Sequence, residues 1–291
     1  MATDTTEKEA GDLKITIAGG DRRMLTLAEL FESRGVGCHL LGFDSYPDKP
    51  KEFQFTKDMG VIAESTAVIL PFPCQKDGFL NTPFSTGRTE IDSLFELGKD
   101  TLFLGGGLPL RGENLIDYSE QEDFLLRNAV PTAEGALALA MQMLGTTLWG
   151  SEITLLGYGR IGSYLSNLLH WLGAKVTVVA RSAKSRTLAE ISGVCAVDFC
   201  DCLSPLSCAD IVFNTIPSRV LGEKELSAMA KGTIVIDLAS LPGGVDEKDC
   251  ANHKILLVRA MGLPGKVAPK TAGKAIFETV LRLLSERGIF I

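Results

Sequence analysis

Several features that define other classes of protein are missing from this chain of 291 residues. It has no apolar run of the ~18 residues that a membrane-spanning helix needs. It has no block of like charges, and its net charge of −7 argues against a nucleic-acid-binding surface. Its polar start, MATDTTEKEAGDLK, lacks the apolar segment of a secretory signal. We therefore expect a cytoplasmic protein that binds neither membranes nor nucleic acid.

The cysteines form no recognisable metal motif and suggest no disulfide framework. Their number, seven, is odd, and no C-x-x-C pair occurs among them. Four are close in the sequence, but their spacing is irregular for zinc or an iron–sulfur cluster. These four are Cys195, Cys200, Cys202 and Cys208. Because cysteine packs well as a small apolar residue, we expect packed cysteines and no metal site.

Short apolar strands alternate with helical segments along the whole chain, and this alternation predicts an α/β fold of two Rossmann-like domains. The first, a flavodoxin-like substrate domain, is expected over residues 1–128, with a flexible tail at residues 1–12. A βαβ opening predicts parallel strands there. The strands are expected at residues 13–20, 38–43, 66–71 and 101–104, and the helices at residues 21–34 and 89–98.

The second domain is expected over residues 129–270 as a doubly wound parallel sheet. It begins with an alanine-rich helix at residues 131–144, with Pro131 in the first turn, where proline is tolerated best. A last helix within residues 271–291 is apolar on one face and is expected to cross back and pack on the first domain. The strands of the second domain are expected at residues 153–156, 175–180, 211–214, 233–237 and 255–258.

A glycine-rich turn indicates what the second domain binds. The run Gly157-Tyr-Gly-Arg-Ile-Gly162 follows one predicted strand, opens a helix and precedes a second strand at βαβ distance. The three glycines allow a tight turn, close approach to a pyrophosphate and close packing of helix on strand. The helix N-terminus also offers free N–H groups to phosphate. We predict a dinucleotide site formed by Gly157, Tyr158, Gly159, Arg160, Ile161 and Gly162.

The second strand of this βαβ unit ends without the acid that usually binds the ribose of NAD. It ends instead on Arg181-Ser182, with Lys184 and Arg186 close behind. A guanidinium pairs well with phosphate, and a hydroxyl can donate one more bond. The pattern therefore favours NADP(H), bound by Arg181, Ser182 and Lys184. The alternative is a solvated basic loop.

Two later loops are expected at the same edge of the sheet, because ligands of open α/β sheets bind beyond the carboxyl ends of the strands. The loop at residues 214–217 is expected to line the nicotinamide ribose. The loop at residues 237–244 is expected to complete the pocket. The cofactor residues expected from these loops are Thr215, Ile216, Pro217, Asp237 and Leu238.

The order of the domains resembles that of the 2-hydroxyacid dehydrogenases, but the residues of their mechanism are missing. That family uses an arginine after the strand at residues 233–237, an acid, and a late histidine as proton shuttle. The arginine position here reads Leu238-Ala-Ser240. Neither His39, His170 nor His253 lies where the shuttle is needed. Oxidation of an alcohol by that mechanism is therefore not expected.

Another resemblance extends over nearly the whole chain. Its most specific part is the late run GLPGKVAPKTAG at residues 262–273. With the runs at residues 19–23, 131–135, 216–218, 237–240 and 242–244, it resembles the family of dipicolinate synthase A subunits. The resemblance implies a sporulation enzyme of the mother-cell cytoplasm. Such an enzyme makes pyridine-2,6-dicarboxylate from a dihydrodipicolinate-level intermediate or its hydrated precursor, together with a flavoprotein-like B subunit.

A substrate with two carboxylates needs cationic and hydroxyl donors. The candidates are Arg22, Arg23, Lys266, Lys270, Thr271 and Ser240. The two arginines follow a Gly-Gly turn at a helix N-terminus, a position that favours anions. For the two lysines, the alternative is simple solvation at the surface. The family often has Ser-Arg-Pro-Gly-Gly where this chain reads Ser240-Leu-Pro-Gly-Gly244, so another cation must serve here if that arginine binds a carboxylate.

Two other functions remain open at this point. One is an NADP-dependent oxidoreductase of a different small carboxylate on the same scaffold. The other is a nucleotide-binding regulatory or assembly subunit whose partner performs the chemistry. We also expect a homo-oligomer.

Overall fold

A computed structural model describes residues 13–291, so the tail expected at residues 1–12 lies outside the described part. The expected α/β fold with two parallel sheets is confirmed. The chain divides into two compact units. Unit 1 consists of the described residues up to Arg127 together with Pro269–Ile291, and unit 2 consists of Asn128–Ala268. No helix of the described chain is long and apolar enough to cross a membrane.

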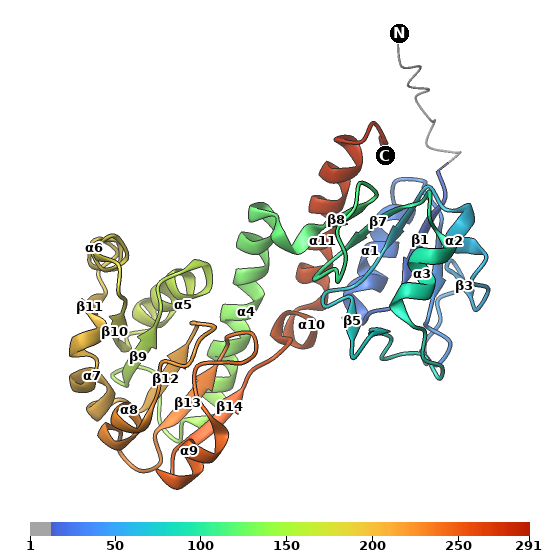
Figure 1. Ribbon diagram of the computed structural model, residues 1–291. Helices are drawn as coiled ribbons and strands as arrows, with labels where there is room; N and C mark the ends of the chain where they lie inside the picture. The colour runs from blue at the N-terminus through green and yellow to red at the C-terminus, as the bar shows by residue number, and fades with distance from the viewer. Residues whose placement is uncertain (1–12) are drawn as a thin grey trace. The chain divides into compact units, whose positions relative to one another are not determined.

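Unit 1 is built on a six-stranded parallel sheet of order β3-β2-β1-β4-β7-β8 (Figure 1). This is the order of doubly wound dinucleotide-binding sheets, and it differs from the flavodoxin order because β3 adds an edge beside β2. A small hairpin, β5–β6, lies outside the sheet. The strands are β1 (Ile15–Ala18), β2 (Cys38–Leu41), β3 (Gln54–Thr56), β4 (Ala67–Ile69), β5 (Gln75–Lys76), β6 (Phe79–Leu80), β7 (Leu102–Gly105) and β8 (Leu115–Asp117).

Helices cover both faces of this sheet. The apolar side chains of α1 (Arg22–Glu32) and α11 (Pro269–Ser285) pack on one face. Those of α2 (Val61–Glu64) and α3 (Ile91–Leu97) pack on the other. A single turn, η2 (Tyr118–Glu120), follows β8. The last helix thus crosses back to the first sheet, as the sequence predicts.

The helices α1 and α11 touch along their length and run parallel (Figure 1). A Cβ added to Gly273 would lie 2.5 Å from the carbonyl oxygen of Arg23, so only glycine allows this approach. Further along, the rings of Phe31 and Phe277 meet edge to face at 5.0 Å. The two helix N-termini therefore lie at the same end, which is also the end where the strands of the parallel sheet finish.

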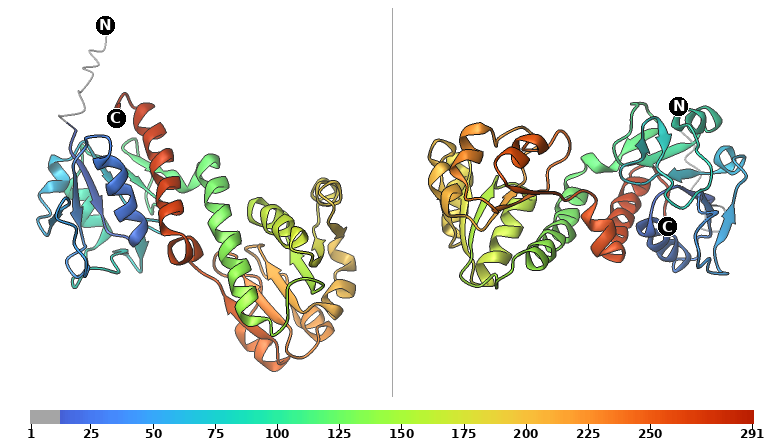
Figure 2. Two further views of the ribbon diagram at one scale, coloured as in Figure 1. Left: turned by 180° about the vertical axis from the view of Figure 1, so that it is seen from behind. Right: turned by 90° about the horizontal axis from the view of Figure 1, so that it is seen from below.

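Unit 2 repeats the same order with β11-β10-β9-β12-β13-β14, again all parallel (Figure 1). Helices lie on both sides of this sheet (Figure 2). Alternate residues of its strands face opposite sides: Ile211 and Phe213 pack toward α5 and α6, and Val212 packs toward α7, α8 and α9. The strands are β9 (Glu152–Leu156), β10 (Lys175–Val179), β11 (Cys195–Val197), β12 (Ile211–Asn214), β13 (Ile234–Asp237) and β14 (Leu256–Arg259). The helices are α5 (Arg160–Trp171), α6 (Ala183–Ile191), η3 (Phe199–Asp201), α7 (Leu203–Cys208), α8 (Glu223–Ala228), α9 (Glu247–Asn252) and α10 (Leu263–Val267).

The prediction that Pro131 lies in the first turn of its helix is wrong. Helix α4 (Glu122–Met143) begins nine residues earlier, so the proline lies inside it. Proline has no N–H to donate, at a cost of about 3 kcal/mol in a helix interior. The helix continues because both halves are held by cores: Phe124 is buried in unit 1, and Ala133 is buried in unit 2. The hydroxyl of Thr132 also donates to the carbonyl oxygen of Asn128 at 2.7 Å.

The packing expected for the cysteines holds for only part of the set. The side chains of Cys38, Cys74, Cys202 and Cys250 are buried. Burial raises the pKa of Cys74 and of Cys250 to about 11, so these thiols stay protonated. Three other cysteines are exposed, because β11 and the short helices after it lie at the edge of the sheet: Cys195, Cys200 and Cys208. Within the described residues, no group of cysteine, histidine and acidic side chains could hold a metal.

Candidate nucleotide-binding site

The glycine turn between β9 and α5 forms the centre of the candidate site. Gly157 has φ +95°, a conformation that glycine adopts easily, and its N–H donates to the carbonyl oxygen of Val179 at 3.0 Å. A Cβ on Gly157 would come within 2.5 Å of the Thr215 hydroxyl oxygen. A Cβ on Gly162 would clash with the carbonyl oxygen of Gly157. These two glycines therefore let the helix begin directly against the end of the strand.

Gly159 has a different environment. It caps α5 with φ −91°, and a Cβ built on it would meet no protein atom within 4 Å. The missing side chain thus leaves open space at the helix N-terminus, where the first N–H groups have no partner inside the helix. A pyrophosphate needs this combination of open space, N–H donors and helix dipole. The residues present therefore fit a bound dinucleotide.

The side chains of the turn face different surroundings. Tyr158 is half-buried, and its hydroxyl lies 3.5 Å from the Leu188 carbonyl oxygen and 3.4 Å from the Ser192 hydroxyl. It therefore joins the turn to α6. Arg160 is exposed at the start of α5, and Ile161 is half-buried against the core.

The residues of the basic segment after β10 have two different roles. Arg181, Ser182 and Lys184 are exposed around the first turn of α6, where the Ser182 hydroxyl caps the helix. Arg186 is turned inward instead. It donates to the carbonyl oxygens of Ala180 and Arg181, each at 2.8 Å, and pairs with Asp198. Arg186 therefore fixes the loop, and the exposed residues are available to a ligand.

The loop after β12 approaches the glycine turn closely. The Thr215 hydroxyl donates to the carbonyl oxygen of Leu156 at 2.9 Å, and Ile216 lies 2.9 Å from the Cβ position of Gly157. Pro217 is exposed just beyond. These three predicted residues thus line the same corner of the sheet as the glycine turn.

Direct contact of Asp237 and Leu238 with a cofactor does not fit their side-chain positions. The Leu238 side chain is buried in the core of unit 2. The Asp237 side chain is 1% exposed, and each carboxylate oxygen accepts two bonds. Its donors are the Asn214 amide, the Ala239 and Gly244 N–H groups and the Arg259 guanidinium. A carboxylate offers about four acceptor sites, so none remains for a ligand.

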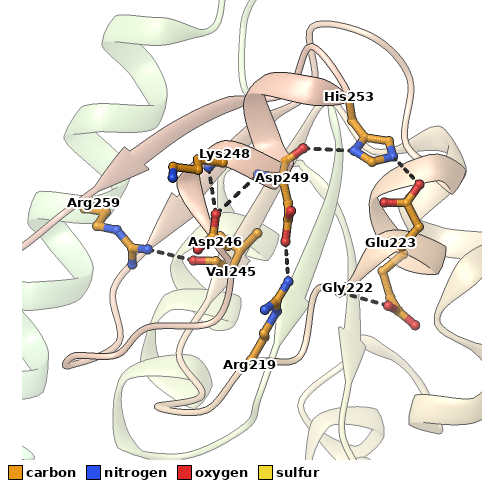
Figure 3. Close-up of polar contacts among 10 residues, drawn as sticks. Arg219, Gly222, Glu223, Val245, Asp246, Lys248, Asp249, His253 and Arg259 are labelled. Carbon is orange, nitrogen blue, oxygen red and sulfur yellow. Dashed lines mark hydrogen bonds and ion pairs between the residues drawn. The ribbon is translucent and has the colours of Figure 1, made fainter.

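Arg259 was not among the residues predicted from the sequence. It ends β14 and donates to Asp237 at 3.0 Å. It also donates to the carbonyl oxygen of Val245 at 2.7 Å (Figure 3). The sequence did contain a signal for it, because Arg259 directly follows the apolar run at residues 255–258 that predicts a strand.

The candidate substrate residues fall into two groups. Arg22, Lys270 and Thr271 are exposed near the neighbouring N-termini of α1 and α11 in unit 1. Arg23 is 7% exposed and donates to Asp21 at 2.8 Å and to the Phe72 carbonyl oxygen at 2.6 Å. It therefore supports the turn more than it faces a ligand.

The remaining two candidates belong to unit 2. Ser240 is exposed in the loop after β13, and Lys266 is exposed on the short helix α10. Leu241, at the position where the family often has arginine, is 71% exposed and so places an apolar side chain beside Ser240.

None of the three histidines is arranged as a proton shuttle beside the glycine turn. His253 is at the end of α9, where its ring nitrogens lie near the Asp249 carbonyl oxygen at 2.9 Å and Glu223 at 3.1 Å (Figure 3). The hydrogen bond to Asp249 and the nearby Glu223 carboxylate raise the pKa of His253. His170 is exposed at the end of α5, and His39 lies within β2 of unit 1.

Two doubly wound units, the second with a glycine turn open to phosphate, form the architecture of dehydrogenases that bind a nicotinamide dinucleotide. Residues 127–251 match the D-isomer specific 2-hydroxyacid dehydrogenase NAD binding domain. Residues 14–121 match the N-terminal domain of the dipicolinate synthase A subunit. A relative from Bacillus subtilis (strain 168), the A subunit of dipicolinate synthase, is 33% identical over 94% of this chain and 96% of its own length. The chain belongs to the family of dipicolinate synthase A subunits.

Solved structures agree with this assignment. The A subunit of dipicolinate synthase from Bacillus halodurans has a TM-score of 0.84 and 28% identity, and covers 96% of this chain and 99% of its own. The corresponding dipicolinate synthase structure from Bacillus subtilis has a TM-score of 0.82 and 30% identity, and covers 94% and 96%.

The different surroundings of Gly159 and Gly162 give opposite expectations for adding a methyl group. Gly159→Ala should keep the free energy of unfolding within about 0.5 kcal/mol of the wild type, because the methyl meets no protein atom. It should weaken dinucleotide binding at least tenfold, since the methyl occupies the approach of the pyrophosphate. Gly162→Ala should lower the free energy of unfolding by about 1–3 kcal/mol through overpacking. Urea unfolding measures the stability, and calorimetric titration measures the dinucleotide affinity. Wild-type affinity in Gly159→Ala would show that the phosphates do not bind at this turn.

Proposed function

We propose that this chain acts as the A subunit of a dipicolinate synthase. It oxidises a dihydrodipicolinate-level intermediate, or its hydrated precursor, to dipicolinate with NADP, in the mother-cell cytoplasm of a sporulating bacterium. A flavoprotein-like B subunit is its partner. The observation that carries the proposal is the likeness to a dipicolinate synthase A subunit over nearly the full length of both chains.

The preference for NADP over NAD is supported by charge at the end of β10. Within the described residues of this corner, Arg181, Ser182 and Lys184 surround the first turn of α6, and the carboxylate of Asp198 is paired with Arg186. A 2′-phosphate therefore meets exposed cations and a helix N-terminus. An NAD ribose would lack its usual carboxylate partner there.

The reaction requires little acid–base catalysis from the protein. A bound nicotinamide would supply the hydride acceptor for this oxidation. The substrate also loses a ring proton, and the aromatic pyridine that forms supplies driving force. A strong general base is therefore not required, in agreement with the positions of the three histidines.

The chain's own contribution is to bind and orient two carboxylates. Arg22, Lys270 and Thr271 offer charge and hydroxyl donors at two neighbouring helix N-termini of unit 1. Ser240 and Lys266 offer the same kinds of donor in unit 2. Charge-assisted bonds of this type are stronger than neutral ones, so each group of donors is suited to a carboxylate.

The proposed reaction can be tested by reconstitution. The mixture contains this chain, its B-subunit partner, NADP and freshly generated dihydrodipicolinate-pathway intermediate, and each component is also omitted in turn. Dipicolinate absorbance and NADPH formation should rise together and should depend on this chain and on NADP. Tight NADP binding without any dependence on this chain would instead support a regulatory role or another carboxylate substrate.

Replacing Arg181 tests the choice of cofactor. Hydrogen bonds to charged groups contribute about 1.5–3 kcal/mol, so Arg181→Ala should weaken NADPH binding by roughly 10- to 100-fold. Binding of NADH should change much less. Lys175→Ala is the control, because Lys175 is an exposed cation at the opposite end of β10. Equal losses for both nucleotides in titrations would contradict a 2′-phosphate contact at Arg181.

Replacing Lys270 tests the substrate site. Lys270→Ala should reduce turnover of the dicarboxylate by roughly tenfold, the effect of one charge-assisted bond. It should not abolish NADP binding, because the predicted dinucleotide residues all belong to unit 2. Lys274→Ala, one turn further along α11 and also exposed, is the matched control. Unchanged steady-state kinetics in Lys270→Ala would show that this lysine does not belong to the substrate site.

A further inference from the structure

Three polar residues end three neighbouring strands of unit 2 in one row. The pairing places Asn214 of β12 opposite Asp237 of β13, and Asp237 opposite Arg259 of β14. The Asn214 amide donates to one Asp237 oxygen at 2.8 Å, and the Arg259 guanidinium donates to the other at 3.0 Å. We name Asn214, Asp237 and Arg259 the strand-end row.

Each member of the row also holds a backbone segment beyond the sheet. Asn214 binds both the N–H and the carbonyl oxygen of Ile216, at 3.1 and 3.0 Å. Asp237 accepts from the N–H groups of Ala239 and Gly244, at 3.2 and 2.9 Å. Arg259 donates to Val245, where the same loop ends (Figure 3). The row therefore fixes the loop after β12 and both ends of the loop after β13.

The Pro-Gly-Gly run packs directly on the row. Gly243 has φ +84°, and a Cβ there would clash with the Arg259 guanidinium and lie 2.6 Å from Asp237. A Cβ on Gly244 would clash with the Asn214 amide. The two glycines thus allow the backbone to come close enough for its N–H to reach a buried carboxylate.

These two loops lie on one particular side of the glycine turn. The turn follows β9, and β10, which ends at the basic segment for the adenosine half, is the neighbour of β9 on one side. The row ends β12, β13 and β14, on the other side of β9. A dinucleotide whose pyrophosphate lies at the turn extends its nicotinamide half over this second side.

We propose that Asp237 is a positioning residue for the nicotinamide half of the dinucleotide. It acts through the loops at residues 214–217 and 238–244 and does not touch the ligand. The adenosine half has a separate support, in which Arg186 holds the end of β10. The two halves of the pocket are therefore set by different polar networks. This inference rests on the dinucleotide binding in the proposed function.

The substitution Asp237→Asn removes the charge and keeps the shape. In either orientation, the NH2 group of the new asparagine cannot accept a hydrogen bond and faces two donors. These are Asn214 and Ala239 in one orientation, or Gly244 and Arg259 in the other. At least one loop anchor is therefore lost, and Arg259 loses its charged partner. Asp210→Asn is the matched control, since Asp210 is exposed at the amino edge of the same sheet and accepts a bond from the N–H of Glu152.

The test compares binding of NADP⁺ with binding of adenosine 2′,5′-bisphosphate, which lacks the nicotinamide half, by calorimetry on the full chain. Asp237→Asn should weaken NADP⁺ binding at least tenfold and change the fragment by less than twofold. In the reconstituted assay kcat should fall by roughly 100-fold, the effect of a ~1 Å misplacement. Asp210→Asn should leave all three values unchanged.

Two results would overturn the inference: equal losses for NADP⁺ and the fragment, or unchanged NADP⁺ affinity and kcat. If Asp237→Asn does not fold, Arg259→Gln provides the same comparison, because it removes one anchor and leaves three donors on Asp237. If the wild type prefers NAD⁺, the comparison uses NAD⁺ and ADP. A wild type that binds neither dinucleotide contradicts the proposed function itself, before any variant is compared.

Discussion

The start of helix α5 touches the end of strand β9, and the rest of the candidate site depends on this contact. Gly162 lies against the carbonyl oxygen of Gly157 with no room for a side chain. The approach directs the N–H groups of the first helical turn toward the open space above Gly159. The neighbouring strands then determine what surrounds that space: basic residues follow β10 on one side, and the strand-end row follows β12, β13 and β14 on the other. A parallel sheet makes this possible because all its strands finish at one edge.

Much of this arrangement could be predicted from the sequence, and the limits have physical causes. The strands of unit 2 around the glycine turn are four or five residues long and strongly apolar, so their pattern is clear. Strands β3, β8 and β11 have three residues each and lie at sheet edges, where burial is incomplete. Three residues that are only partly buried give no clear apolar run, whereas β4, which also has three residues, is fully buried and was predicted. The edge strand β3 is also what changes the strand order of unit 1.

The residues whose observed roles differ from the predicted ones are those that contact distant segments of the chain. Asp237 follows an apolar strand, as a ligand-binding acid also does, and its inward direction depends on Arg259, 22 residues later. Pro131 resembles a helix start, and the helix continues through it because two separate cores hold its two halves. The local sequence cannot distinguish these cases, since the deciding contacts come from other segments of the chain.

The crossing back of α11 affects the order in which the protein can fold during synthesis. Domains generally fold as units as they leave the ribosome, beginning at the N-terminus. Here the core of unit 1 includes Ile276, Phe277 and Val280, which are made after every residue of unit 2. Unit 2 is continuous in the sequence and can complete its core first. Until α11 arrives, the part of α1 that packs on α11 stays uncovered, so α1 is made before unit 2 but reaches its full stability after it.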